Sequence, residues 1–213
     1  QAQIRCEKIF ASNGAVKFVL RISGDALAVR LPLPGRHNVM NALAAAAVAL
    51  QLGVSSADIV AGLESFKPCP GRMELVGLPN DILLLEDSYN ANPLSMRAAL
   101  DALHDLGGQG RRIALLGDML ELGEHSRMFH EEIGTLLASR GFDLVVGIGA
   151  LGTVVADKAA ERGVKAAVFA GTEEACRGIA DHLCANDMVL IKGSRAMQLE
   201  NLFPALRSAA VTI

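Results

Sequence analysis

Five polar side chains follow a short apolar run in the segment LLLEDSYNANPLSM, which spans Leu83–Met96. They are Asp87, Ser88, Tyr89, Asn90 and Asn92, and Pro93 comes directly after them. Because proline is well tolerated in the first turn of a helix, we place the cluster in a loop between a buried strand and a helix. Capping by Asn92 and Asx turns at Asp87 and Asn90 explain one or two of these residues. They do not explain all five, so we predict a ligand-binding loop.

Two later segments also end an apolar run in charged or polar side chains. IALLGDMLELGEHS does so at Asp118 and Met119, and VLIKGSRAMQLE does so at Lys192, Ser194 and Arg195. One interpretation is that Lys192 and Arg195 are solvated or cap a nearby helix, where a charge contributes little. We favour a binding role, because neighbouring glycines leave the backbone open beside these side chains.

His37, Asn38 and Asn41 open an Ala-rich stretch that has the composition of a helix. In a capping interpretation, Asn38 is the N-cap and His37 is incidental. In a binding interpretation, the two amides lie on one helix face and offer the donor and acceptor that an adenine edge requires. Spacing alone leaves both interpretations open.

Other signals argue against several classes of function. The pattern Gly147-x-Gly149-x-x-Gly152 matches a dinucleotide fingerprint, but it follows a late strand, and Ala170-Gly171 stands where an acid should end the next strand. The sequence has no G-x-x-x-x-G-K-[ST] phosphate loop, no metal-binding histidine spacing and no C-x-x-C pair. A net charge of −3 gives no electrostatic reason to bind nucleic acid. No apolar run approaches the roughly 20 residues of a membrane span, and we expect a cytoplasmic protein with reduced cysteines.

The elements that must position these residues fall into two groups. Three alternating segments, RCEKIFA, AVKFVLRI and ALAVRLPL, predict an antiparallel meander, followed by one helix over Asn38–Leu52 and another capped by Ser56. The segment KPCPGR, Lys67–Arg72, is the strongest break and predicts a linker between domains 1–68 and 69–213.

Strands and helices alternate after this break. The predicted strands are Met73–Gly77, Ile82–Glu86, Arg112–Leu116, Leu144–Ile148, Ala167–Phe169 and Met188–Ile191. The predicted helices are Pro93–Leu106, Ser126–Ser139, Leu151–Arg162, Thr172–Leu183 and Gln198–Ser208. This order is typical of an α/β fold with a doubly wound, mostly parallel sheet, in which ligands bind at the carboxyl ends of the strands.

Five motifs, in order, resemble the Mur ligases: GRHNVMNALAAAAVA, PGRME, EDSYNANPLSM, LGDMLELGE and IKGSRAMQLE. LGDM-x-ELGE and KGSR resemble more particularly the branch of that family that adds D-alanyl-D-alanine to a UDP-N-acetylmuramoyl-tripeptide. The resemblance implies that 1–68 is the last part of a central ATP-binding domain and that 69–213 is a complete Rossmann-like domain. It also implies a missing part that holds the UDP-sugar, the phosphate loop and the Mg²⁺ ligands, so we expect this chain alone to be inactive.

The resemblance further implies roles for the candidate residues. His37, Asn38 and Asn41 would face the adenine of ATP, Arg72 its phosphates and Asp87 its ribose. Tyr89, Asn90 and Asn92 would line the junction of nucleotide and dipeptide, with Asn90 on the nucleotide side. Asp118, Met119, Lys192, Ser194 and Arg195 would shape the dipeptide pocket. A different ligase of the superfamily and a stand-alone nucleotide-binding module remain alternatives.

Overall fold

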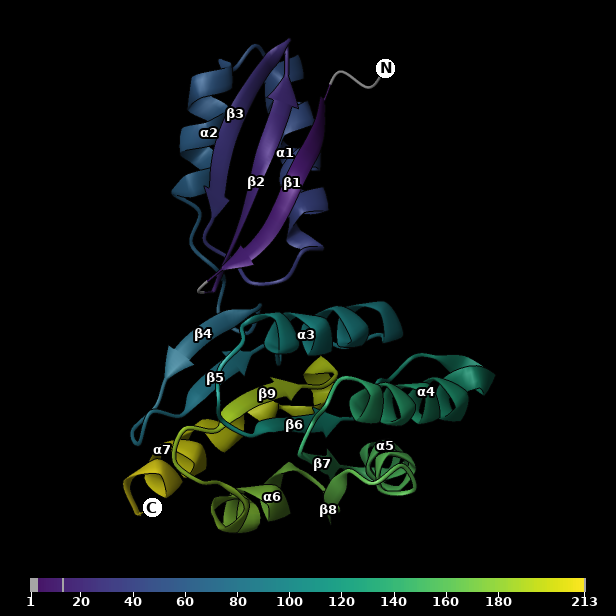
Figure 1. Ribbon diagram of the computed structural model, residues 1–213. Coiled ribbons are helices and arrows are strands. Elements are labelled where there is room, and N and C mark those ends of the chain that lie inside the picture. Colours follow the sequence, from purple (N-terminus) through teal and green to yellow (C-terminus); the bar gives the residue numbers. More distant parts are fainter. Residues whose placement is uncertain (1–3, 13, 213) are drawn as a thin grey trace. The chain divides into compact units, whose positions relative to one another are not determined.

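The computed structural model describes residues 4–12 and 14–212 (Figure 1). Residues 1–3, 13 and 213 lie outside the described part, including the first three residues of the predicted domain 1–68. The chain divides into two compact units, Gln1–Pro68 and Cys69–Ile213, called here the N-terminal and C-terminal units. None of the helices in the described part of the chain has both the length and the apolar character that a bilayer crossing needs.

The N-terminal unit is a three-stranded sheet covered by two helices. The strands β1 (Ile4–Ser12), β2 (Ala15–Ile22) and β3 (Asp25–Leu31) pair antiparallel in that order, which confirms the predicted meander. Alternate residues of β2 are buried and form a core with one face of α1 (Asn38–Gln51) and of α2 (Ser56–Glu64). The alternation of apolar and polar residues in AVKFVLRI therefore reflects the single buried face of this sheet.

Two predicted helix caps in this unit are wrong by one residue. Asn38 is the first residue of α1, and the position before it, His37, has helical dihedral angles and no side-chain cap. The cap of α2 is Ser55, which has extended dihedral angles and accepts a hydrogen bond from the Asp58 N–H at 3.1 Å. Asp58 in turn accepts from the Ser55 hydroxyl at 2.6 Å, and this reciprocal pair favours Ser55 over Ser56 as the cap.

The C-terminal unit is built on one six-stranded sheet. Its strands are β4 (Glu74–Gly77), β5 (Leu83–Glu86), β6 (Arg112–Gly117), β7 (Leu144–Ile148), β8 (Lys165–Phe169) and β9 (Met188–Lys192). Their spatial order is β4-β5-β9-β6-β7-β8, and only β4 runs antiparallel to its neighbour. The predicted doubly wound, mostly parallel sheet is confirmed.

Helices cover both faces of this sheet (Figure 1). One face carries α3 (Pro93–Asp105), α4 (Ser126–Ser139) and α5 (Ala150–Ala160), and the other carries α6 (Thr172–Gly178) and α7 (Phe203–Thr212). The helix predicted over Thr172–Leu183 is α6 followed by a 3₁₀ turn, Ile179–His182. The helix predicted from Gln198 begins later, because Gln198 has left-handed dihedral angles (φ 49°, ψ 45°) that no α-helix continues.

The strand order creates a reversal point at β9. The chain passes from β5 through α3 to β6 and then outward to β8, and it returns to insert β9 between β5 and β6. The loops after β5 and β6 lead to helices on one face, whereas the chain after β9 leads to α7 on the other. Such a reversal opens a crevice at the carboxyl ends of the strands, where ligands of open α/β sheets bind.

Candidate functional site

The loop after β5 is anchored by two buried acids. The Glu86 carboxylate accepts hydrogen bonds from the Gly71 N–H and the Ser88 hydroxyl, and the Asp87 carboxylate accepts from the Met73 N–H at 3.2 Å. The Tyr89 N–H completes the contact by donating to the Gly71 carbonyl at 3.0 Å. The end of the predicted linker is thus fixed to the loop, and Asp87 does not form the Asx turn that we considered.

Asp87 and Lys192 form a buried ion pair across β5 and β9. The Lys192 side chain is 2% exposed, and its ammonium donates to Asp87 Oδ2 and, at 2.8 Å, to the Asn90 carbonyl. Burial raises the pKa of Asp87 and lowers the pKa of Lys192, and the attraction between the two charges opposes both shifts. The interpretation of Lys192 as a solvated cation is therefore wrong, because its charge is used inside the protein.

Asp118, at the end of β6, caps a helix. Its Oδ1 accepts from the N–H groups of Leu151 and Gly152, at 2.9 and 2.7 Å, in the first turn of α5. The carboxylate thus lies at a helix N-terminus, the place that a pyrophosphate occupies in a dinucleotide site. Gly149, with φ +92°, allows this approach, since a Cβ there would lie 2.7 Å from Asp118 Oδ1. Close packing explains the glycine pattern here.

The ends of β6 and β9 are tied together by Ser194. Its N–H donates to the Asp118 carbonyl at 3.0 Å, and its hydroxyl accepts from the Leu120 N–H at 2.8 Å. The neighbouring Met119 side chain is fully buried, and its N–H donates to His130 Nε2 at 2.9 Å. These contacts give Ser194 and Met119 structural tasks within the crevice wall.

The remaining candidates of this unit reach the surface. The Arg72 guanidinium lies 4.1 Å from the centroid of the half-exposed Tyr89 ring, a cation–π contact. The Arg195 side chain is 59% exposed and pairs with Glu200. Asn90 and Asn92 are exposed. The carboxyl edge of the sheet thus presents two guanidinium groups, a phenol ring and two amides to solvent.

Asn92 fulfils the predicted capping role at the start of α3. Its Oδ1 accepts from the Ser95 N–H at 2.8 Å, and Ser95 Oγ accepts from the Asn92 N–H at 3.1 Å. This reciprocal pair fixes the loop after β5 to the helix that follows it.

The predicted amides of the N-terminal unit are neighbours on α1. The buried Asn38 donates through Nδ2 to the Pro34 carbonyl at 2.8 Å. It also accepts through Oδ1 from Asn41 Nδ2 at 3.1 Å. Asn41 and His37 are exposed. Asn38 therefore holds both the preceding turn and the Asn41 amide.

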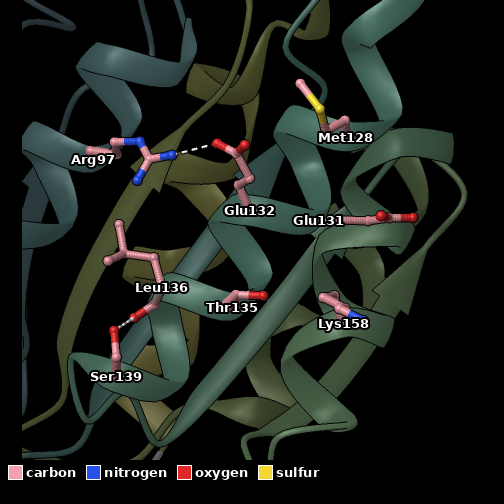
Figure 2. A pocket seen from close by; sticks show the side chains of 8 residues that line it. All are labelled: Arg97, Met128, Glu131, Glu132, Thr135, Leu136, Ser139 and Lys158. Carbon is pink, nitrogen blue, oxygen red and sulfur yellow. Dashed lines mark hydrogen bonds and ion pairs between the residues drawn. The ribbon is translucent and has the colours of Figure 1, made fainter.

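A separate pocket lies on the outer surface of α4, flanked by α3 and α5 (Figure 2). It is lined by Arg97, Met128, Glu131, Glu132, Thr135, Leu136, Ser139 and Lys158, and none of these is a predicted site residue. Its charged groups are paired, Arg97 with Glu132, Glu131 with Arg127, and Lys158 with Glu161. In the described residues, no group of three or more His, Cys, Asp or Glu side chains gathers that could hold a metal ion.

Sequence reasoning missed Glu86 and His130. Glu86 was assigned to a strand, and a signal was present, because a buried carboxylate at a strand end needs hydrogen-bond donors. Histidines scattered over predicted helices are expected to be at the surface or partly buried, yet His130 is fully buried. Its position on the inner face of α4 was the available signal.

Family models match both units. The model described as "Mur ligase, glutamate ligase domain" matches residues 71–195, and the model described as "Mur ligase middle domain" matches residues 1–49.

Named proteins match as well. The chain is 36% identical over 174 residues to the UDP-N-acetylmuramoyl-tripeptide–D-alanyl-D-alanine ligase of Bacillus subtilis (strain 168), covering 81% of this chain and 38% of that protein. It is 41% identical over 141 residues to the ligase of the same name from Escherichia coli (strain K12), covering 66% of this chain and 31% of that protein. A crystal structure of MurF from Acinetobacter baumannii matches with a TM-score of 0.87 at 34% identity, over 97% of this chain and 46% of that one. The chain thus spans less than half the length of each.

Proposed function

We propose, from the premise that this chain belongs to the Mur ligase family, that it is part of an ATP-dependent ligase joining D-alanyl-D-alanine to a UDP-N-acetylmuramoyl-tripeptide. The observation that carries the proposal is its identity of 36% and 41% to two ligases named for that reaction. The reaction would place the protein in peptidoglycan precursor synthesis, and so in cell-wall growth, cell shape and cell division in the cytoplasm.

The two units take different parts in this proposal. Residues 1–68 belong to the middle domain and bring His37, Asn38 and Asn41 to the adenine of ATP. Residues 69–213 form the last domain, with Arg72, Asp87 and Asn90 on the nucleotide side. The family implies Mg²⁺ with ATP, and we assign its ligands to a part of the enzyme outside this chain.

The geometry divides the acceptor side into contact and support. Arg195, Tyr89 and Asn92 present exposed groups that can touch the dipeptide. Asp118, Met119, Lys192 and Ser194 act behind them, because their polar groups are engaged in the hydrogen bonds and ion pair that shape the crevice.

In this reaction, the main task of the protein is to position the reacting groups. The terminal carboxylate of the tripeptide takes the γ-phosphoryl group of ATP, and ADP leaves. The amine of D-alanyl-D-alanine then attacks the acyl phosphate, an amide bond forms and phosphate leaves. Charge develops on phosphoryl oxygens, so fixed cations such as Arg72 and well-placed donors supply the catalysis.

The test replaces the exposed cation on the acceptor side. In the full-length enzyme, Arg195→Ala should raise the KM for D-alanyl-D-alanine roughly fivefold, about 1 kcal/mol, because the dipeptide carboxylate loses a cationic partner whose side chain is 59% exposed. The KM for ATP should stay near its original value. Arg207→Ala, at an exposed position in α7, is the matched control. Equal increases in both KM values would move the acceptor site elsewhere.

A further inference from the structure

The segment Asp118–Leu120 is held by three different elements. The Asp118 carboxylate is fixed to the first turn of α5, and the Leu120 N–H is fixed to Ser194 after β9. The Met119 N–H, between them, is fixed to His130 on α4. The segment follows the carboxyl end of β6, and contacts from α4, α5 and the loop after β9 fix its position.

The contacts of His130 determine its protonation state and tautomer. The ring is fully buried. Nε2 lies 2.9 Å from the Met119 nitrogen, which can only donate, so Nε2 must accept. Nδ1 lies 2.6 Å from the Ser126 carbonyl oxygen, which can only accept, so Nδ1 must carry the proton. The ring serves both partners only as the neutral Nδ1–H tautomer.

The Met119 N–H depends on this ring as its acceptor. It is buried at the point where β6 has ended, and burying a donor without an acceptor is costly. Releasing it would also disturb Leu120, whose own N–H bonds to Ser194, the neighbour of Arg195. Two hydrogen bonds, joined by the backbone between Met119 and Leu120, thus connect His130 to the loop that carries the exposed cation.

We propose that His130, as the neutral Nδ1–H tautomer, is a positioning residue that holds the Asp118–Leu120 segment and, through Ser194, the Arg195 loop in the form that binds the acceptor dipeptide. The inference rests on the proposed function for the identity of the ligand. The hold on the segment itself does not depend on that function.

Two substitutions separate the two ring nitrogens. In His130→Gln, the side-chain oxygen reaches about as far as Nε2 and can still accept from Met119. In His130→Asn, the shorter amide reaches only the position of Nδ1, so it can serve Ser126 but leaves Met119 without an acceptor. Both replace an imidazole with a smaller amide, so loss of packing affects both. His104→Gln, at an exposed position on α3, is the control.

The first measurement is amide hydrogen exchange on the full 213-residue chain. The Met119 amide should exchange at least about tenfold faster in His130→Asn than in the original chain, and His130→Gln should stay within roughly threefold. Imidazole ¹⁵N shifts of the unmodified chain should show a protonated Nδ1 and an unprotonated Nε2. The opposite tautomer, or equal exchange in the Gln and Asn variants, would overturn the proposal.

The second measurement titrates D-alanyl-D-alanine and follows the Leu120 and Arg195 amides. His130→Asn should weaken binding several-fold, and His130→Gln should restore it. Equal weakening in both variants would reduce His130 to a packing role and overturn the proposal. If the unmodified chain shows no response to the dipeptide, the proposed function fails at this site, while the exchange data still decide whether His130 holds the segment.

Discussion

Lys192 and Asp87 face each other inside the C-terminal unit, where both charges have been removed from water. The cost of burying two charges is only partly returned by their attraction, so removing one partner is far worse than removing both. The pair links the ends of β5 and β9, the two strands that border the crevice at its reversal point. At the scale of single residues, the pair therefore helps to fix the shape of the candidate site.

Lys192→Met should lower the free energy of unfolding of the C-terminal unit by roughly 3–5 kcal/mol, because it leaves the Asp87 carboxylate buried without its cation. The double variant Asp87→Asn/Lys192→Met is the matched control and should lose clearly less. Urea unfolding followed by tyrosine fluorescence measures this, since the chain has one tyrosine, Tyr89, and no tryptophan. If the loss in the double variant equals the sum of the losses in Lys192→Met and Asp87→Asn, the two charges do not interact.

The same variant should have a distinct pH dependence. Without the ammonium, burial and the nearby Glu86 charge raise the pKa of Asp87 further above the ordinary value of 3.8, and only the hydrogen bond from the Met73 N–H still opposes them. A raised pKa in the folded state contributes stability that is present below the unfolded pKa and is lost as the pH rises through the folded pKa. The loss in unfolding free energy caused by Lys192→Met should therefore be smaller at about pH 4 than at about pH 7. A deficit that grows on acidification would contradict this assignment.

The sequence predicted which polar side chains follow the strands better than which of those side chains are exposed. Asn92 was identified as a cap because capping is a local interaction, and Ser95 lies three residues away. The partners of Lys192 and Asp118 are distant: Asp87 lies 105 residues from Lys192, and Leu151 lies 33 residues from Asp118. Only the strand order of the folded protein reveals that these charges form contacts within the protein.

At the scale of helices and strands, some predicted boundaries agree with the structure and others differ by one or more residues. β7 and α4 have the predicted bounds, Leu144–Ile148 and Ser126–Ser139. β8 is longer than predicted by two residues, because its first residues are exposed and carry no apolar signal. The left-handed conformation of Gln198, which breaks the last predicted helix, has no sequence signal of the kind that a glycine provides.

Gly134→Ala should destabilise the C-terminal unit by about 1–3 kcal/mol, although alanine is the better helix former. Gly134 lies where α4 crosses α5, and a Cβ there would come within 2.6 Å of the Val155 carbonyl oxygen. Gly62→Ala in α2 is the matched control, since no atom lies within 4 Å of its Cβ position. That change should stabilise the N-terminal unit by roughly 0.4–1 kcal/mol. Equal effects of the two changes in thermal unfolding would show that the helices can separate without cost.

At the scale of the whole chain, the two units differ in how completely they bury apolar surface. The C-terminal unit has helices on both faces of its sheet (Figure 1). In the N-terminal unit, helices cover one face of the three strands. Met40 and Val48 of α1 and Leu52, the residue that follows this helix, are 66%, 62% and 77% exposed. These three residues are separated by multiples of four and form an exposed apolar stripe on the helix. A small unit with such a stripe should be the less stable of the two.

Limited proteolysis tests this difference and the position of the linker together. Phe66 is 44% exposed, so chymotrypsin should cut after it early and leave a stable piece that contains the C-terminal unit. Trypsin should cut after Arg72 much more slowly, because hydrogen bonds to Glu86 and Asp87 anchor the flanking Gly71 and Met73. The piece before the cut should be degraded further, since it buries too little surface to resist. Rapid cleavage after Arg72 would show that the anchored segment opens readily. A single protected core with no cleavage between Phe66 and Met73 would contradict a linker at this position.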